Sequence, residues 1–285
     1  MADQTEPVHF FDIKCTLEGP RQSWSPNTLK TRAVLNIKGI LYTQSWISYP
    51  DIAPLCAGLG IPAVPDDSSS PPILYTLPAI IHKPSITSNP NGAMHDSLPI
   101  ALHLDKAFPS PQYPSVFPHG QTSIALALAT EKLFHNVVAK CATLLFPAVA
   151  DILDDRGAAY FEKTRLPRWQ RRHPNLTLTK MADLKPKTEA EIDKMVEETK
   201  KALLFFDELL AGGGENKGPF LEGEKPGFAD VMLAAHMAWI ERPLPEFFAR
   251  IIDAGNGSIR KHWEASQGFL NGQGETKEWP VAAKI

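Results

Sequence analysis

The first part of the chain alternates short apolar runs with polar, turn-rich breaks. Residues 8–13, VHFFDI, are mostly β-branched or aromatic and predict a strand. Apolar residues then recur at four-residue spacing between Pro26 and Gly39, which predicts a helix that a glycine ends. Alternation in residues 41–48 predicts a second strand, and residues 50–60 predict a short, proline-marked helical turn.

The following stretch adds a hairpin and a helix. Residues 61–72, IPAVPDDSSSPP, predict a loop. An Asn-Gly turn separates the apolar residues 77–82 from the brief run 93–95, which predicts two strands joined as a hairpin. Residues 96–108 place apolar side chains on one helical face. The order βαβ followed by ββα predicts a small open sheet with helices on its faces.

A proline-rich stretch, residues 109–118, marks a break between two regions. Four of its ten residues are proline. Such segments are semi-rigid connectors that few contacts cross. We therefore predict an α/β domain over residues 1–108, a linker over 109–118 and an all-helical domain over 119–285.

Apolar periodicity beyond this linker is helical. Residues 121–146 predict a long helix that Pro147 ends or kinks. A capping box that begins at Thr188 starts another helix, which ends at Gly212. Residues 229–240 contain few polar side chains and predict a buried helix.

The segment between these helices, residues 155–187, is charged and has an irregular pattern. It contains four arginines around Trp169 in the run RLPRWQRRHP. An arginine cluster of this kind can bind an anionic or aromatic ligand, but we interpret it first as a solvated surface loop.

Composition and charge limit the classes of function. A formal charge of -3 and 43% hydrophobic residues are typical of a globular protein and give no reason to expect nucleic acid as a partner. The start has no secretory pattern and no stretch approaches the roughly 20 apolar residues of a membrane helix, so we expect a cytoplasmic protein without a membrane partner. Cys15, Cys56 and Cys141 are widely spaced, so we expect neither disulfides nor a metal site.

Ser25 and Pro26 stand where a loop becomes a helix. This pair is a common helix start, because proline has no N–H and a serine hydroxyl caps a free backbone donor. The same position can also stabilise an anion such as a thiolate, since the helix dipole and a hydroxyl donor both favour negative charge there. These residues alone leave both interpretations open.

Two further residue pairs, Leu77-Pro78 and Asp96-Ser97, likewise allow both a structural and a ligand-binding interpretation. Pro78 marks either a sheet edge or a cis proline, and in the second case the backbone of Leu77 is free to pair with a peptide-like ligand. Asp96 and Ser97 are either plain helix caps or a site for a zwitterion, in which the aspartate binds an ammonium and the serine a carboxylate. Together with a thiol at Ser25, these features fit γ-Glu-Cys-Gly, which is glutathione.

Element order and motifs resemble those of the cytosolic glutathione transferases over essentially the whole chain. The motifs WSPNTLKTRAVLNIKGI, SYPDI, LYTLPAI, HDS and AYFEKTR are similar to those of the fungal-specific class A, which is related to bacterial β-etherases. The resemblance implies a thioredoxin-like domain followed by an all-helical one, glutathione as co-substrate without a metal, and a homodimer. It also implies that Ser25 activates the thiol and that Asn27 assists. The acceptor would be a small hydrophobic or aromatic electrophile in a pocket between the domains, with Trp24 as a wall.

Two positions depart from the family pattern. Leu29 stands where this class often has tryptophan, which would reshape the acceptor pocket. Gly227 stands where a serine or threonine usually caps a helix. Because glycine caps only slightly less well and Asp230 can reach back three residues, we expect a modest effect on stability.

Several alternatives compete with the transferase interpretation. Cys15 lies in the same loop as Ser25 and would suit a thiol-type member, although it lacks a helix start and a CPxC context. A β-etherase-like lyase, a non-catalytic carrier of hydrophobic phenolics and a regulatory protein that borrowed the fold are further alternatives. The set of glutathione-recognition residues favours the transferase, and the identity of the electrophile stays open.

Overall fold

The computed structural model describes residues 6–64, 72–214, 218–272 and 274–281. Its first part is built on a mixed sheet with the strand order β4-β3-β1-β2-β5. The strands are β1 (Val8–Ile13), β2 (Tyr42–Ile47), β3 (Ala79–Ile81), β4 (Ala93–His95) and β5 (Glu275–Thr276). Strand β1 runs parallel to β2 and antiparallel to β3, β3 runs antiparallel to β4, and β2 runs parallel to β5.

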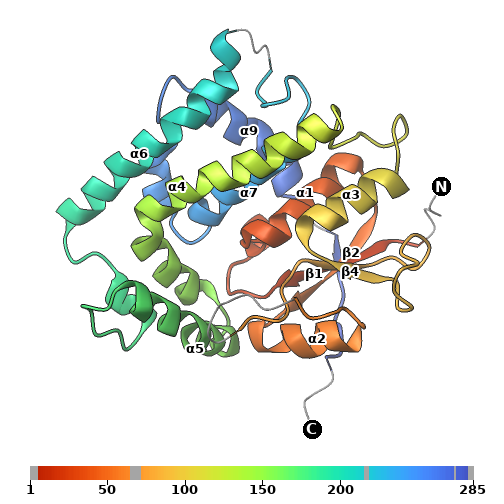
Figure 1. Ribbon diagram of the computed structural model, residues 1–285, viewed down its shortest axis with the longest axis horizontal. Helices are drawn as coiled ribbons and strands as arrows, with labels where there is room; N and C mark the ends of the chain where they lie inside the picture. Colours follow the sequence, from red (N-terminus) through yellow and green to blue (C-terminus); the bar gives the residue numbers. More distant parts are fainter. Residues whose placement is uncertain (1–5, 65–71, 215–217, 273, 282–285) are drawn as a thin grey trace.

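Three helices cover this sheet. They are α1 (Pro26–Lys38), α2 (Ile52–Gly58) and α3 (Ser97–Ala107), with short 3-10 turns η1 (Gly19–Gln22) and η2 (Tyr49–Asp51). Helices α1 and α3 lie on one face and α2 on the other (Figure 1). Gly39 ends α1 with a positive φ of 63°, a conformation that glycine adopts without strain. The expected strands, the hairpin and these helices are confirmed, while residues 65–71 of the expected loop 61–72 lie outside the described residues.

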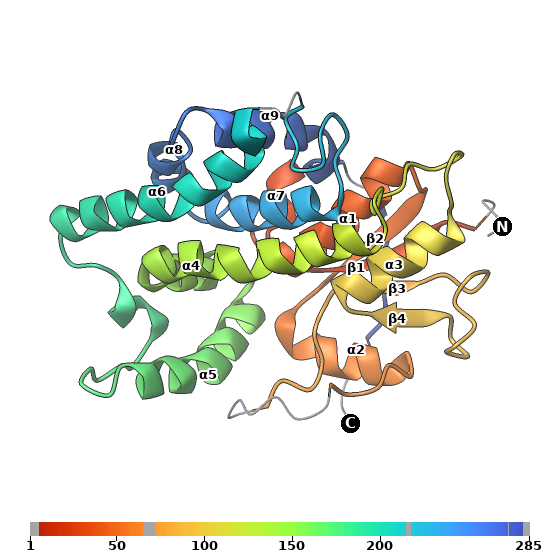
Figure 2. The same cartoon turned by 45° about the horizontal axis from the view of Figure 1, so that its top comes forward.

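The second part is mostly helical. Its elements are α4 (Gln121–Ile152), α5 (Asp155–Arg172), η3 (Met181–Leu184), α6 (Glu189–Ala211), η4 (Gly212–Gly214), α7 (Phe228–Glu241), α8 (Pro245–Ile251) and α9 (Ser258–Leu270). Helix α7 is buried along almost its whole length and packs against α1, α4, α8 and α9 (Figure 2). The expected capping box is present, because the Glu191 N–H donates to Thr188 Oγ1 at 3.3 Å and the Thr188 N–H donates to Glu191 Oε2 at 3.0 Å.

Helix α4 differs from expectation in two ways. It continues through Pro147 to Ile152, because Pro147, Val149 and Ile152 are buried and their packing outweighs the hydrogen bond that proline removes. It is also long and apolar enough to span a membrane by length and composition, contrary to the expectation that no stretch approaches such a span. In the structure α4 packs against α5, α6 and α7.

The expected irregular segment, 155–187, begins instead with a regular helix. Helix α5 includes Pro167 and buries Gly157, Phe161, Thr164 and Trp169 on one side. Those buried positions are few, and the charged residues between them obscure the helical period.

The second part is mostly helical, and the segment after its last helix, α9, contributes β5 to the sheet of the first part. Residues 109–118 form neither helix nor strand, and Tyr113, Val116 and Phe117 within them are buried. The domain limits themselves stay a prediction.

Gly227 precedes α7 as expected. Asp230 reaches back to it, since Asp230 Oδ2 accepts the Gly227 N–H at 3.0 Å. The Glu222 carboxylate occupies the space that a Cβ atom at position 227 would take. A serine cap would therefore displace Glu222 from its hydrogen bond with Ser123, so the glycine suits this local arrangement.

Candidate active site

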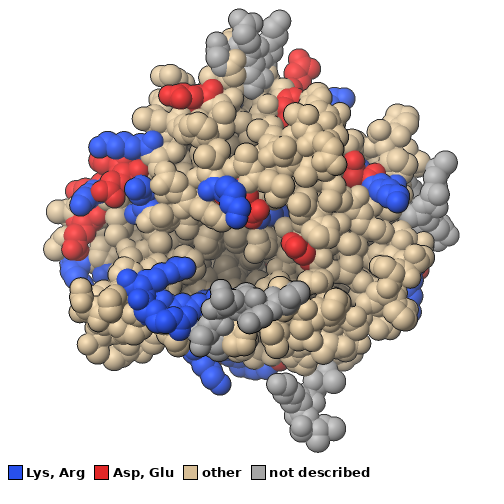
Figure 3. Space-filling view, in the orientation of Figure 1, with Lys and Arg blue, Asp and Glu red and all other residues tan. Residues whose placement is uncertain are grey.

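Two cavities meet at the N-terminus of α1. One, of about 460 Å³, lies between this terminus, η2 and α5 and is here called the α5 cavity; its lining includes Ser25 and Arg165. The other, of about 360 Å³, lies toward α3 and α4 and is called the α3 cavity; its lining includes Asp96 and Ser97. Asn27, Thr76 and Leu77 line both, so the two cavities adjoin. Figure 3 shows a hollow in the centre of this face.

Ser25 precedes α1 at the wall of the α5 cavity. It is 5% exposed, and its hydroxyl makes no capping hydrogen bond. The Leu29 N–H and the Thr28 hydroxyl both donate to the backbone oxygen of Ser25, at 2.9 and 3.2 Å. The hydroxyl is therefore not used as a helix cap and lies at the positive end of the helix dipole, where it can donate to an anion.

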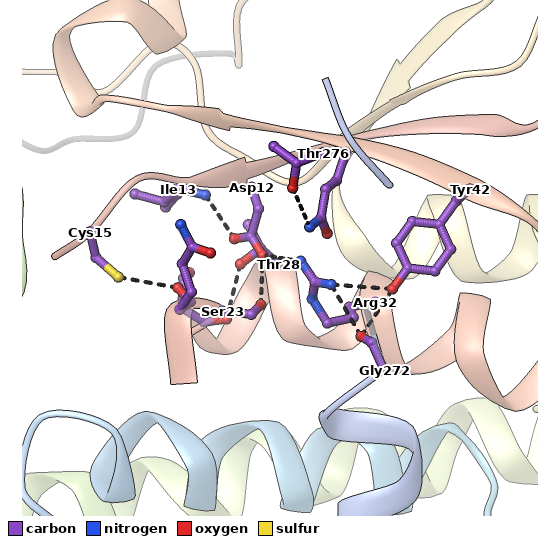
Figure 4. A network of polar contacts seen from close by, with 12 residues as sticks. Asp12, Ile13, Cys15, Ser23, Thr28, Arg32, Tyr42, Gly272 and Thr276 are labelled. Carbon is purple, nitrogen blue, oxygen red and sulfur yellow. Dashed lines mark hydrogen bonds and ion pairs between the residues drawn. The ribbon is translucent and has the colours of Figure 1, made fainter. Parts of the chain in front are cut away.

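A buried polar network holds the loop that leads to Ser25 (Figure 4). Arg32 Nη2 and Asp12 Oδ2 lie 3.0 Å apart, and both side chains have 0% exposure. The Ser23 hydroxyl donates to the same carboxylate oxygen at 2.6 Å, and the Ile13 N–H donates to Asp12 Oδ1 at 2.7 Å. Because Ser23 is two residues before Ser25, this carboxylate fixes the approach to the α1 terminus.

Arg32 also connects the network to distant parts of the chain. Its Nη1 donates to the Tyr42 hydroxyl and to the Gly272 carbonyl, each at 3.2 Å. Its guanidinium lies 5.3 Å from the centre of the Phe10 ring and 5.4 Å from that of Trp46. The network thus joins β1, α1, β2 and the segment after α9.

A second ion pair lies beside the α3 cavity, whose lining includes Glu131. Lys30 Nζ donates to Glu131 Oε1 at 2.8 Å and to Asn27 Oδ1 at 3.2 Å. Burial lowers the pKa of Lys30, with Glu131 opposing the shift. Burial raises the pKa of Glu131, but the charge and hydrogen bond of Lys30 outweigh it and lower that pKa overall. Asn27 is therefore positioned by Lys30 on the first turn of α1, at the point that both cavities share.

Leu77 and Pro78 form the floor between the two cavities. The peptide bond between them is cis, which decides between the two interpretations of Pro78. Within the described residues the backbone N–H and C=O of Leu77 make no hydrogen bond. Both groups are therefore available to an extended ligand.

Asp96 and Ser97 begin α3 on the far side of the α3 cavity. Ser97 is buried and Asp96 is exposed, and the Asp96 side chain makes no capping hydrogen bond. Asp96 has a φ of 74°, the only positive φ outside glycine in the described chain. Its N–H donates to the Pro78 carbonyl at 3.1 Å, which holds the pair beside the cis proline.

Two residues, Trp24 and Leu29, are placed differently from expectation, and a third, Cys15, is buried. Trp24 lines neither cavity: it is 2% exposed and lies in the core behind Tyr49, with ring centres 6.4 Å apart. Leu29 is fully buried in the core and also lines neither cavity. Cys15 lies 3.2 Å from the Gln22 carbonyl, and burial raises the pKa of its thiol to about 12. The Cys15 alternative is therefore unfavourable, because such a thiol is protonated near neutral pH.

Two aromatic residues of the α5 cavity, Tyr49 and Tyr160, were not predicted from the sequence. Tyr49 and Tyr160 line it and stack with ring centres 6.1 Å apart and an interplanar angle of 11°. Burial raises the pKa of Tyr49, against the charge of Arg165, so its phenol stays a donor. These residues lie within the motifs SYPDI and AYFEKTR, but nothing in the sequence places the two motifs side by side. Among the described residues no group of three or more His, Cys, Asp or Glu could hold a metal ion.

Comparisons with known proteins find relatives over nearly the whole chain. The family profile described as glutathione S-transferase, C-terminal domain, matches residues 125–269. The glutathione S-transferase-like protein ustS of Aspergillus flavus is 47% identical over 280 residues, which cover 98% of this chain and 96% of that protein. A glutathione S-transferase of Ceriporiopsis subvermispora, solved in complex with glutathione, is 28% identical with a TM-score of 0.75 and covers 93% of this chain and 98% of its own. Glutathione transferase GSTFuA3 of Phanerochaete chrysosporium is 27% identical with a TM-score of 0.74, over 93% and 97% of the two chains.

Proposed function

Because this chain belongs to the cytosolic glutathione S-transferase family, with a thioredoxin-like first part, we propose that Ser25 activates the thiol of glutathione for attack on a hydrophobic or aromatic electrophile. The observation that carries the proposal is the Ser25 hydroxyl, which lies at a helix N-terminus and a cavity wall without acting as a cap. A glutathione thiol has a pKa of about 8.5 in water, and a helix N-terminus with a hydroxyl donor lowers it.

Glutathione would lie across both cavities. Its cysteine would pair with the free backbone groups of Leu77, beside the cis Pro78. Its γ-glutamyl end would enter the α3 cavity, where Ser97 can donate to the carboxylate and Asp96 can bind the ammonium. This arrangement directs the sulfur toward Ser25 and the α5 cavity.

Asn27 and the α5 cavity would serve the reaction itself. Asn27 accepts from Lys30 through Oδ1, which leaves its amide N–H groups as donors toward the sulfur or its substrate. The thiolate sulfur forms a bond to the electrophilic carbon, the leaving group departs with its electron pair, and the thiol proton passes to solvent. The two stacked tyrosines, Tyr49 and Tyr160, supply a flat aromatic wall for the acceptor.

The proposal is tested by the thiolate absorbance of bound glutathione measured across pH. Loss of one hydrogen bond to the charged sulfur should raise the thiol pKa in Ser25→Ala by about one to two units. The variant Ser25→Thr keeps a hydroxyl and should retain most of the shift. Cys15→Ser is the matched control, because the Cys15 thiol is buried and protonated; it should behave as the wild type.

Two outcomes would oppose the proposal. If glutathione binds to the wild-type protein without a lowered thiol pKa, Ser25 does not activate it and the carrier interpretation is favoured. If Cys15→Ser abolishes the shift while Ser25→Ala preserves it, the thiol-type chemistry is the correct one.

A homodimer in the cytoplasm completes the proposal. Exposed leucines on α3 and α4, Leu102, Leu128 and Leu133, give these helices an apolar surface that a second copy could cover. Light scattering coupled to size exclusion would distinguish a dimer from a monomer.

A further inference from the structure

The feature that the proposed function leaves unused is Arg165, on α5. It is the only charged side chain among the described residues that line the α5 cavity. The other lining residues are apolar or neutral, and three of them are tyrosines: Tyr49, Tyr75 and Tyr160. A single charged side chain in an otherwise uncharged cavity lining is unusual, because charged side chains that are shielded from water are normally paired with an opposite charge.

Arg165 is held in place but its charge is not neutralised. Its guanidinium lies 5.9 Å from the centre of the Tyr49 ring and 5.4 Å from that of Phe161. Its Nη1 donates to Thr164 Oγ1 at 3.1 Å, and no carboxylate of the described chain forms an ion pair with it. The guanidinium therefore retains donors for an anion.

The wall that carries Arg165 is anchored to the first part of the chain. Arg156 at the start of α5 donates to both carboxylate oxygens of Asp51, at 2.8 and 2.6 Å. The Ser48 hydroxyl donates to Asp154 Oδ2 at 2.9 Å. These contacts and the stacked tyrosines fix α5 against η2, so the cation is held in position before a ligand arrives.

Charge on the surrounding surface agrees with an anionic ligand. Figure 3 shows Lys and Arg side chains gathered over α5 at the edge of the hollow. The basic residues of this helix are Arg156, Lys163, Arg165, Arg168, Arg171 and Arg172.

From these observations we infer that Arg165 binds a carboxylate carried by the acceptor, so that the natural electrophile is an aromatic or conjugated acid. This inference rests on the proposed function. Glutathione also has a carboxylate at its glycine end, but the proposed glutathione contacts all come from the first part of the chain, whereas Arg165 comes from α5. The planar guanidinium matches a carboxylate in two parallel hydrogen bonds while the tyrosines contact the ring.

The test uses a pair of acceptors that differ only in charge: 4-chloro-3-nitrobenzoate and its methyl ester. In both, the thiolate sulfur bonds to the ring carbon that carries chlorine, and chloride leaves with the electron pair of the broken bond. The glutathione conjugates of both are then titrated calorimetrically into the wild type and Arg165→Gln. We expect Arg165→Gln to weaken binding of the acid conjugate about tenfold and to change binding of the ester conjugate less than about twofold.

Control variants separate charge from fold. Arg172→Gln removes an exposed arginine of the same helix outside the cavity and should bind both conjugates as the wild type does. Arg165→Lys keeps the charge without the planar fork and should lie between the wild type and Arg165→Gln. If Arg165→Gln does not fold, the comparison of the acid and ester conjugates on the wild type and Arg165→Lys still decides the question.

Each outcome has a distinct meaning. Equal effects of Arg165→Gln on the acid and ester conjugates overturn the inference. The inference is also overturned if Arg165→Gln weakens binding of glutathione tenfold but leaves binding of the glycine ethyl ester of glutathione unchanged. In that case Arg165 binds the glycine carboxylate of glutathione and not a carboxylate of the acceptor. A third outcome separates the two proposals. If the protein turns over neither acceptor, but Arg165→Gln weakens binding of the acid conjugate alone, the proposed transferase activity fails while Arg165 still binds a carboxylate.

Discussion

Replacement of Arg32 by methionine should destabilise the protein strongly. The substitution leaves the Asp12 carboxylate, which has 0% exposure, without its cation at 3.0 Å. Removal of one partner of a buried ion pair typically costs about 3–5 kcal/mol. The lost donors to Tyr42 and Gly272 add to this cost. Since whole domains are stable by only about 5–15 kcal/mol, a large part of the folding free energy should disappear.

Urea denaturation gives the free energy of unfolding for this test. The double variant Asp12→Leu/Arg32→Met removes both charges and should be more stable than Arg32→Met by about 2 kcal/mol or more, because no unpaired charge remains buried. Arg260→Met breaks an exposed pair with Asp253 and should leave the urea midpoint unchanged. A loss below about 1 kcal/mol for Arg32→Met, or simple additivity in the double variant, would refute this account of the network.

Two further predictions concern Asp96 and His9. Asp96 has a φ of 74°, which is unfavourable for any residue except glycine, so Asp96→Gly should raise the free energy of unfolding by about 1 kcal/mol. The same variant loses the carboxylate proposed to bind the ammonium of glutathione, so calorimetry should show weaker glutathione binding. An unchanged affinity for glutathione would contradict this role of the carboxylate. Burial, together with the charge of Lys277, lowers the pKa of His9 from 6.5 to about 4 in the folded protein. As pH falls, the His9 imidazole is therefore protonated in the unfolded chain before it is protonated in the folded protein. The stability from His9 is therefore fully present above about pH 6.5 and should be lost, by about 3 kcal/mol, on acidification to about pH 4. Urea midpoints across this window should depend less on pH in His9→Gln, and an equal pH dependence in both proteins would contradict the prediction.

Local signals in the sequence predict much of the first part of the fold. A serine-proline pair starts α1, and a glycine at φ 63° ends it, because both residues act within one helical turn. The cis proline and the Asp96-Ser97 pair are equally local, so their positions along the chain already suggest the ligand.

Contacts between residues far apart in the chain could not be predicted from the sequence. Lys30 and Glu131 are 101 residues apart and meet only because α1 and α4 both pack against α7. Helix α5 was missed because four buried positions, spread among charged residues, make a weak pattern. The same helix carries Arg165, one of the four arginines around Trp169 for which the sequence left binding of an anionic or aromatic ligand open as the second interpretation.

The parallel pairing of β5 with β2 has a consequence for how the protein is made. Gln44 Nε2 donates to Thr276 Oγ1 across 232 residues of sequence, and the ring of Trp279 packs on those of His9 and Phe11. At about 5–20 residues per second a ribosome needs roughly 10–50 seconds to synthesise the intervening chain. During this interval the nascent sheet presents an open edge at β2, where other chains can pair with it. Cellular yield should therefore depend on chaperones that shield this edge until translation reaches β5.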